Sequence, residues 1–391
     1  YAPARYEGLF PLSMLYALIV VLCAHAVLRA TRRRPTPMRR GQRPPWAGRH
    51  ARLAAVLPPA LALLAVVAAF DWKGGLEMRL RRAARWRDWP ATLTLAHRFV
   101  GREPALETIY CTNQALLHSG QLLEAMFRFP QASLGLSLGM AVDVRTVADG
   151  VELRRWLYYD LGETTLELGL VNHAEHEACE MLTWSGPHPT VLLQLARIYT
   201  VKGNTAAVEH VLRALAKDVV HGDQARTWLK QLRTDPAAAV SAEVLAIRRH
   251  MATADVYDVG MDVLRRGDVL LAADPQNRLA ADCLLGQYLL ERDVAAVVRG
   301  LGRLRAAGYT ALPRHVQEAV VLQEALQQGP VDCQGWTVDP ELRTAYQRFA
   351  AEFQPFYAAG DAAGAGRALA ARFGDSYFYY YACGGSPGMP K

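Results

Sequence analysis

The sequence has few cysteines and none of the short motifs that mark the commonest cofactor sites. Its six cysteines are spread over 391 residues and form no C-x-x-C pair, which excludes the disulfide framework of a small secreted fold. No phosphate-binding loop, dinucleotide fingerprint or convincing pair of carboxylates occurs. We therefore expect no catalytic residue and no cofactor. A single disulfide between Cys333 and Cys383 is an alternative in an oxidising compartment, although isolated thiols are the favoured outcome.

Charge is missing from two long stretches near the N-terminus. Residues 9–28 and 53–70 contain no Asp, Glu, Lys or Arg. Helices of this length rise about 27–30 Å, which matches the hydrocarbon core of a bilayer. The pattern predicts two transmembrane helices, at about 9–28 and 53–70, in preference to two buried core helices.

Acidic residues are missing from the segment between these two stretches. Residues 29–52 hold nine arginines and no Asp or Glu, so this short loop is expected to stay in the cytoplasm, near anionic lipid headgroups. Residues 71–391 then lie on the opposite side of the membrane. We predict an inner-membrane protein of a bacterium whose C-terminal domain is periplasmic.

The positive charge is concentrated at the N-terminus. Residues 1–70 contain ten of the 44 basic residues and only one of the 37 acidic ones, which leaves residues 71–391 nearly neutral. Nucleic-acid binding requires a clustered basic surface. We therefore expect no nucleic-acid partner for the large domain.

From residue 71 onward the apolar residues recur at intervals of three and four, as in helices. Residues 188–218 predict two helices joined at Gly203-Asn204, and residues 273–309 predict two more joined at Arg292-Asp293. A third pair is expected in 105–131, with its turn at Gly120. Such units of roughly 34 residues resemble the tetratricopeptide repeat (TPR), in which each pair covers the apolar face of the next. The predicted fold class is all-α: a transmembrane pair in residues 1–70 and a TPR-like α-solenoid of helical hairpins in 71–391.

Four segments carry a wider resemblance. They are NQALLHSGQLLEAMFRFPQ (113–131), YYDLGETTLELGLVNHAEHEACEML (158–182), LPRHVQEAVVL (312–322) and FGDSYFYYY (373–381). With them, residues 53–391 resemble an uncharacterised family of bacterial membrane proteins with TPR-like C-terminal regions. The resemblance implies an architecture and no activity. One stretch, 132–150, lacks helical periodicity and predicts a long loop.

The segment NHAEHEACEMLTWSGPHP (172–189) is the strongest candidate for a metal site. His173 and Glu177 are four residues apart, as are His176 and Glu180, so each pair shares a helix face. Two ligands at that spacing are typical of zinc helices, with His188 available as a third. We favour a structural helix. In that interpretation the four residues lie on its surface, and the neighbouring apolar residues, Trp184 included, are buried.

Two other features are best explained by packing. The aromatic run Tyr377–Tyr381 is expected to pack on the last helix, in preference to binding a glycan, a peptide or the membrane interface. Trp86 and Trp89 are expected to be interfacial anchors or core residues. His250 is expected at the surface.

These patterns favour a membrane-anchored scaffold that binds a protein partner or another envelope component on its helical repeats. One alternative is an envelope hydrolase or metal-dependent enzyme that uses His173, His176, Glu177 and Glu180. Another is a structural subunit of a larger membrane complex, with the two N-terminal helices packed on other subunits.

Overall fold

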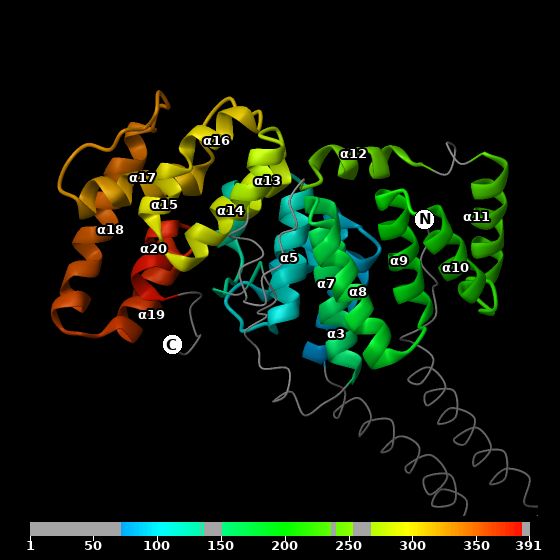
Figure 1. Ribbon diagram of the computed structural model, residues 1–391. Helices are drawn as coiled ribbons and strands as arrows, with labels where there is room; N and C mark the ends of the chain where they lie inside the picture. The colour runs from blue at the N-terminus through cyan, green and yellow to red at the C-terminus, as the bar shows by residue number, and fades with distance from the viewer. Residues whose placement is uncertain (1–71, 134, 137–150, 236–239, 253–266, 385–391) are drawn as a thin grey trace, which may run out of the picture. The chain divides into compact units, whose positions relative to one another are not determined.

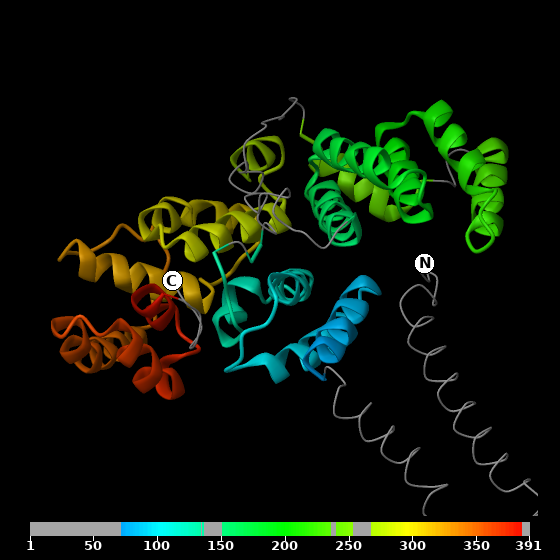
Figure 2. The ribbon, with the colours of Figure 1, turned by 90° about the horizontal axis from the view of Figure 1, so that it is seen from below.

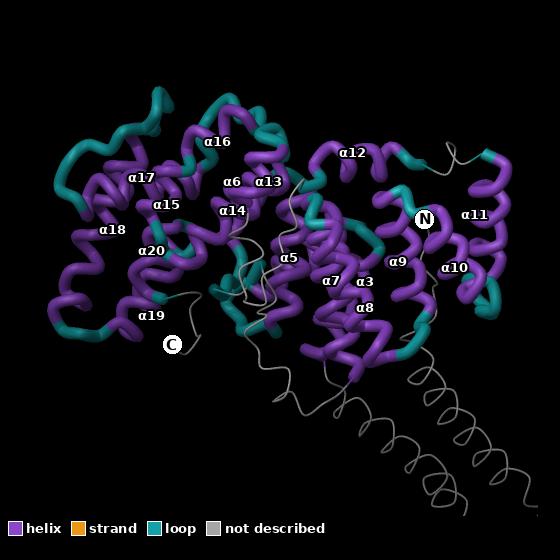
Figure 3. Tube along the Cα trace, in the orientation of Figure 1, coloured by secondary structure: helices purple, strands orange, loops and turns teal. Residues whose placement is uncertain are grey.

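The computed structural model describes residues 72–133, 135–136, 151–235, 240–252 and 267–384. Within these ranges every regular element is a helix, so the prediction of an all-α fold is confirmed (Figure 3). The chain divides into two units, residues 1–76 and 77–391. Both predicted membrane segments, 9–28 and 53–70, lie outside the described residues, as does most of the predicted loop 132–150. Among the helices that are described, none has the length and hydropathy needed to cross a bilayer.

The helices follow one another with short connections. In chain order they are α3 (Trp72–Arg85), α4 (Trp89–Ala96), η1 (His97–Phe99), α5 (Leu106–His118), α6 (Leu122–Ala125), η2 (Met126–Arg128), α7 (Val151–Leu168), α8 (Val171–Ser185), α9 (Pro189–Lys202), α10 (Thr205–Leu215), α11 (Gly222–Thr234), α12 (Ala242–His250), α13 (Gly267–Ala273), α14 (Arg278–Glu291), α15 (Val294–Arg299), α16 (Leu301–Ala306), α17 (Arg314–Leu326), α18 (Pro340–Ala358), α19 (Ala362–Phe373) and α20 (Tyr377–Cys383).

The hairpin α9–α10 forms where the sequence predicts it. Gly203 ends α9 in the left-handed conformation, with φ +72°, which residues without a Cβ adopt readily. The side chain of Asn204 then accepts a hydrogen bond from the N–H of Ala207, 3.1 Å away, and so caps α10. Leu195 and Ile198 of α9, like Leu212 of α10, are buried between the helices.

The other two predicted hairpins are also present, with one difference each. Residues 105–131 fold into α5 and a short α6, joined at Gly120 with φ +65°. Residues 273–309 form α14 and a second arm, but Gly300 divides that arm into α15 and α16. A Cβ at Gly300 would lie 2.7 Å from the Leu285 side chain, so the break falls at a point of close contact with α14.

Helices α7 to α11 form a continuous stack in which each packs on the next (Figure 1). Their shared core consists of buried aliphatic residues, with Leu166 and Ala178 at one end and Leu229 at the other. A segment after α12 closes over the turn between α7 and α8: the N–H of Ala252 donates to the carbonyl of Gly169, 3.2 Å away.

The aromatic helix α20 packs between α17 and the hairpin of α18 and α19 (Figure 2). Tyr377, Phe378, Tyr379 and Tyr380 are all buried, which confirms that the run serves packing. It does more than cover the last helix, because the Tyr380 hydroxyl donates to the carbonyl of Leu290 in α14, 2.9 Å away. All five cysteines in the described residues are free thiols, so Cys333 and Cys383 form no bridge.

Candidate functional site

The polar segment 172–189 is helix α8 and the start of α9, and it divides between two environments. His173 and Glu177 are buried, whereas His176 and Glu180 are partly exposed. The expectation that all four lie on the surface is therefore wrong for His173 and Glu177. Trp184, expected in the core, is 54% exposed. Helix α8 packs on both α7 and α9, and this polar pair is buried together with the apolar residues of the helix.

Burial sets the protonation of this pair. Loss of water lowers the pKa of His173 to about 4, with a further contribution from His176. Burial also raises the pKa of Glu177 to about 7, with a smaller effect from Glu180. The ring Nε2 of His173 lies 3.3 Å from Oε1 of Glu177. Both groups therefore favour their neutral forms near pH 6.

The described residues contain no group of three or more His, Cys, Asp or Glu side chains arranged to hold a metal ion. His188, the candidate third ligand, instead caps α9, with its Nδ1 2.8 Å from the hydroxyl of Thr190.

Trp89 stacks on His118, with ring centroids 4.5 Å apart, and Trp86 is 39% exposed beside the Arg82 guanidinium. His250 is half-buried and hydrogen-bonded to Asp274, so it is not a plain surface residue.

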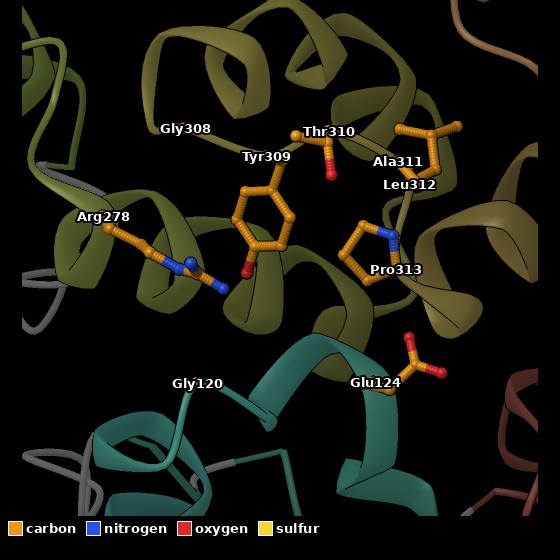
Figure 4. Close-up of a pocket in the computed structure, with 9 residues that line it drawn as sticks. All are labelled: Gly120, Glu124, Arg278, Gly308, Tyr309, Thr310, Ala311, Leu312 and Pro313. Carbon is orange, nitrogen blue, oxygen red and sulfur yellow. The ribbon is translucent and has the colours of Figure 1, made fainter.

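A cavity lies where α5 turns into α6 and meets the loop between α16 and α17 (Figure 4). Its volume is about 290 Å³. The lining residues are Gly120, Glu124, Arg278, Gly308, Tyr309, Thr310, Ala311, Leu312 and Pro313. Three segments far apart in the sequence thus contribute to one site, which the hairpin pattern alone gives no means of finding.

Arg278 and Tyr309 form one wall of this cavity. The guanidinium carbon of Arg278 lies 4.3 Å from the centroid of the Tyr309 ring, a cation–π contact. The Tyr309 hydroxyl donates to Oδ1 of Asp282, 2.6 Å away. Burial raises the pKa of Asp282 to about 6, against the lowering effects of Tyr309 and Arg278, so this carboxylate is still mostly ionised at neutral pH.

A buried polar cluster lies beside the cavity, at the start of α17. The Glu318 carboxylate accepts hydrogen bonds from Nε of Arg314 at 3.0 Å and from Nδ1 of His315 at 2.9 Å. Nε2 of His315 faces the N–H of Phe127 at 3.4 Å, an arrangement that assigns the ring proton to Nδ1. Both His315 and Glu318 are almost completely buried. The cluster satisfies its own charges, which is typical of a structural role.

Three of the four segments that carry the family resemblance meet at this cluster. Phe127 comes from the first, His315 from the third and Tyr377 from the last. The Phe127 ring contacts His315 and Tyr377, with centroids 4.8 and 5.2 Å apart. The arginine, histidine and glutamate that interrupt the apolar run of 312–322 are the sequence signal of this cluster, because charged residues on a buried helix require partners.

Residues 2–384 match a family described as a family of unknown function, DUF6057. The chain belongs to DUF6057. No curated protein and no solved structure matches it. The DUF6057 description assigns no activity, and nothing in the described residues or in these comparisons points to an enzymatic one.

Proposed function

We propose that this protein is a membrane-anchored, TPR-like scaffold of the bacterial cell envelope that binds a protein partner on its helical hairpins. The observation that carries the proposal is the stack α7–α11. Its helices use their apolar residues to pack on one another, and at one end they leave large apolar side chains in solvent. A stack of this kind keeps a binding surface rigid while the side chains on it vary.

The exposed apolar residues lie where α8 and α10 end. Trp184 is 54% exposed, Val219 is 99% exposed and Val220 is 63% exposed. The turn that presents the two valines is fixed by Asp218, whose carboxylate accepts from the backbone N–H groups of Val220 and His221 at 2.9 and 2.7 Å. Tryptophan is enriched among the residues that dominate binding energy at interfaces. A fixed turn loses little entropy on binding.

Site-specific photocrosslinking in intact cells tests the proposal. We expect a photoreactive residue at Trp184 or Val219 to give one discrete crosslinked species of higher mass. The control position is Thr205, which is exposed at the start of α10, at the opposite end of that helix from Val219. Equal crosslinking at all three positions, or at none with the protein well expressed, would count against partner binding at this end.

The membrane anchor and the periplasmic location form the second part of the proposal. They are supported by the uncharged stretches 9–28 and 53–70 and by the nine arginines between them. Fusion of alkaline phosphatase or of green fluorescent protein after residue 384 distinguishes the two orientations. We expect an active phosphatase and a dark fluorescent protein. The reverse result would place the helical domain in the cytoplasm.

A further inference from the structure

The guanidinium of Arg278 is held in place by Tyr309 and Asp282, and part of it still faces the cavity. The ring of Tyr309 supports one face of the group, and the hydroxyl of Tyr309 is itself fixed on Asp282. The guanidinium also interacts with the Tyr309 hydroxyl and forms a loose ion pair with Asp282, but its side chain is 47% exposed, so N–H groups remain available to a ligand. The Nε of Arg278 lies 3.9 Å from Oδ2 of Asp282, which is too far for a hydrogen bond. Two parallel N–H donors of arginine match the two oxygens of a carboxylate.

The charges around the cavity limit which anion fits. Asp282 is 1% exposed, and Glu124 on the opposite wall accepts a hydrogen bond from the N–H of Arg314 at 2.8 Å. These two carboxylates oppose the single positive charge of Arg278, and they repel a dianion such as phosphate about twice as strongly as a monoanion. The rest of the lining is small or apolar, with Ala311, Leu312 and Pro313 on one side.

We propose that this cavity binds a small organic monocarboxylate. The ligand's two oxygens accept hydrogen bonds from the Arg278 guanidinium, and its apolar part packs against Ala311, Leu312 and Pro313. The volume of about 290 Å³ is at the lower end for small-molecule sites, so the ligand is small. Figure 4 shows Arg278 of α14 and Tyr309 of the loop between α16 and α17 lying above the turn at Gly120.

Isothermal titration calorimetry on the purified full chain in detergent tests the proposal. The probes are butyrate and benzoate, their amides butyramide and benzamide, and inorganic phosphate. We expect saturable binding of at least one carboxylate, with its amide and phosphate weaker by about ten-fold or more, because neither combines a single negative charge with two planar acceptor oxygens. Binding of the amide or of phosphate as tightly as the carboxylate, or of no carboxylate at all, would overturn the proposal.

Variants connect the binding to Arg278. Arg278→Gln is expected to abolish it, and Arg278→Lys to weaken it by about ten-fold, because an ammonium lacks the paired donors. Tyr309→Phe keeps the ring but removes the hydroxyl bonded to Asp282, so Asp282 should pair more closely with Arg278 and binding should weaken. Arg343→Gln is the control, since Arg343 is bonded to Glu324 outside the cavity. The side chain of Arg278 is 47% exposed, so its variants should fold, as circular dichroism can verify. Unchanged binding by Arg278→Gln would refute the assignment.

Discussion

The carboxylate of Glu318 accepts a hydrogen bond from the backbone N–H of Tyr377, 2.7 Å away and 59 residues later in the chain. This bond fixes the start of α20 against α17. Together with Arg314 and His315 it gives the buried carboxylate three donors, so its charge is compensated. The same Arg314 reaches Asp375 at 3.0 Å, just before α20. The C-terminal aromatic helix is therefore held by polar contacts as well as by packing.

Replacement of Glu318 by alanine should be strongly destabilising. It leaves His315 and the N–H of Tyr377 without their acceptor in a buried site, and Arg314 keeps only Asp375. Breaking one partner of such a network typically costs about 3–5 kcal/mol. We expect a lower urea midpoint for the purified protein and faster proteolysis near residue 377. Glu324→Ala is the matched control on the same helix, because Glu324 pairs with Arg343 at the surface. A control loss above about 1 kcal/mol would contradict the distinction between buried and exposed pairs.

Asn277 joins two helical hairpins that are far apart in the sequence. Its side-chain oxygen accepts from the N–H of Ala280 at 3.1 Å and caps α14. Its side-chain nitrogen donates to the carbonyl of Leu168 at 3.0 Å, at the end of α7. We expect Asn277→Ala to cost about 2–3 kcal/mol, since it removes both a cap and a buried bond.

Asn204→Ala separates these two effects. Asn204 caps α10 with the same geometry, 3.1 Å to the N–H of Ala207, but it is exposed. Its loss should cost about 1 kcal/mol, the usual value for a cap. Equal losses for the two variants in urea unfolding would mean that the bond from Asn277 to Leu168 contributes nothing.

Local features of the fold could be predicted from the sequence, and contacts between distant segments could not. The turns at Gly120 and Gly203 were predictable because a glycine followed by a polar residue is a turn signal that depends on only a few neighbouring residues. The burial of His173 and Glu177 was not, because periodicity reveals an apolar face but not how much of a helix its neighbours cover. The Arg278 cavity depends on three segments that come together only in the fold.

Gly169 occupies a position that no other residue fits. Its φ is +97°, and a Cβ there would lie 2.3 Å from the carbonyl oxygen of His250. Gly169→Ala should therefore cost about 2–5 kcal/mol, from the left-handed conformation and the backbone clash together. Gly101 has a φ of +74°, and a Cβ there would meet open space. Gly101→Ala should therefore lower the free energy of unfolding by only about 1–2 kcal/mol. Thermal unfolding of both variants measures the difference, and similar melting temperatures would rule out the clash.

His173 and Glu177 should affect stability with opposite dependence on pH. The pKa of His173 falls from 6.5 to about 4 on folding, so its contribution is complete above pH 6.5 and is lost as the pH falls. The pKa of Glu177 rises from 4.5 to about 7, so its contribution is complete below pH 4.5 and is lost as the pH rises. Between pH 4.5 and 6.5 the two effects oppose each other, with slopes of roughly 1.4 kcal/mol per pH unit each.

Single variants should reveal each slope. Relative to the unsubstituted protein, His173→Gln should gain stability as the pH falls from 6.5 to 4.5, because the group that resists protonation is gone. Glu177→Gln should gain stability as the pH rises over the same range, because no buried carboxyl has to ionise. Urea unfolding at pH 4.5, 5.5 and 6.5 measures both differences, and groups elsewhere cancel in the comparison. Parallel changes in the two variants would show that burial does not keep both groups neutral.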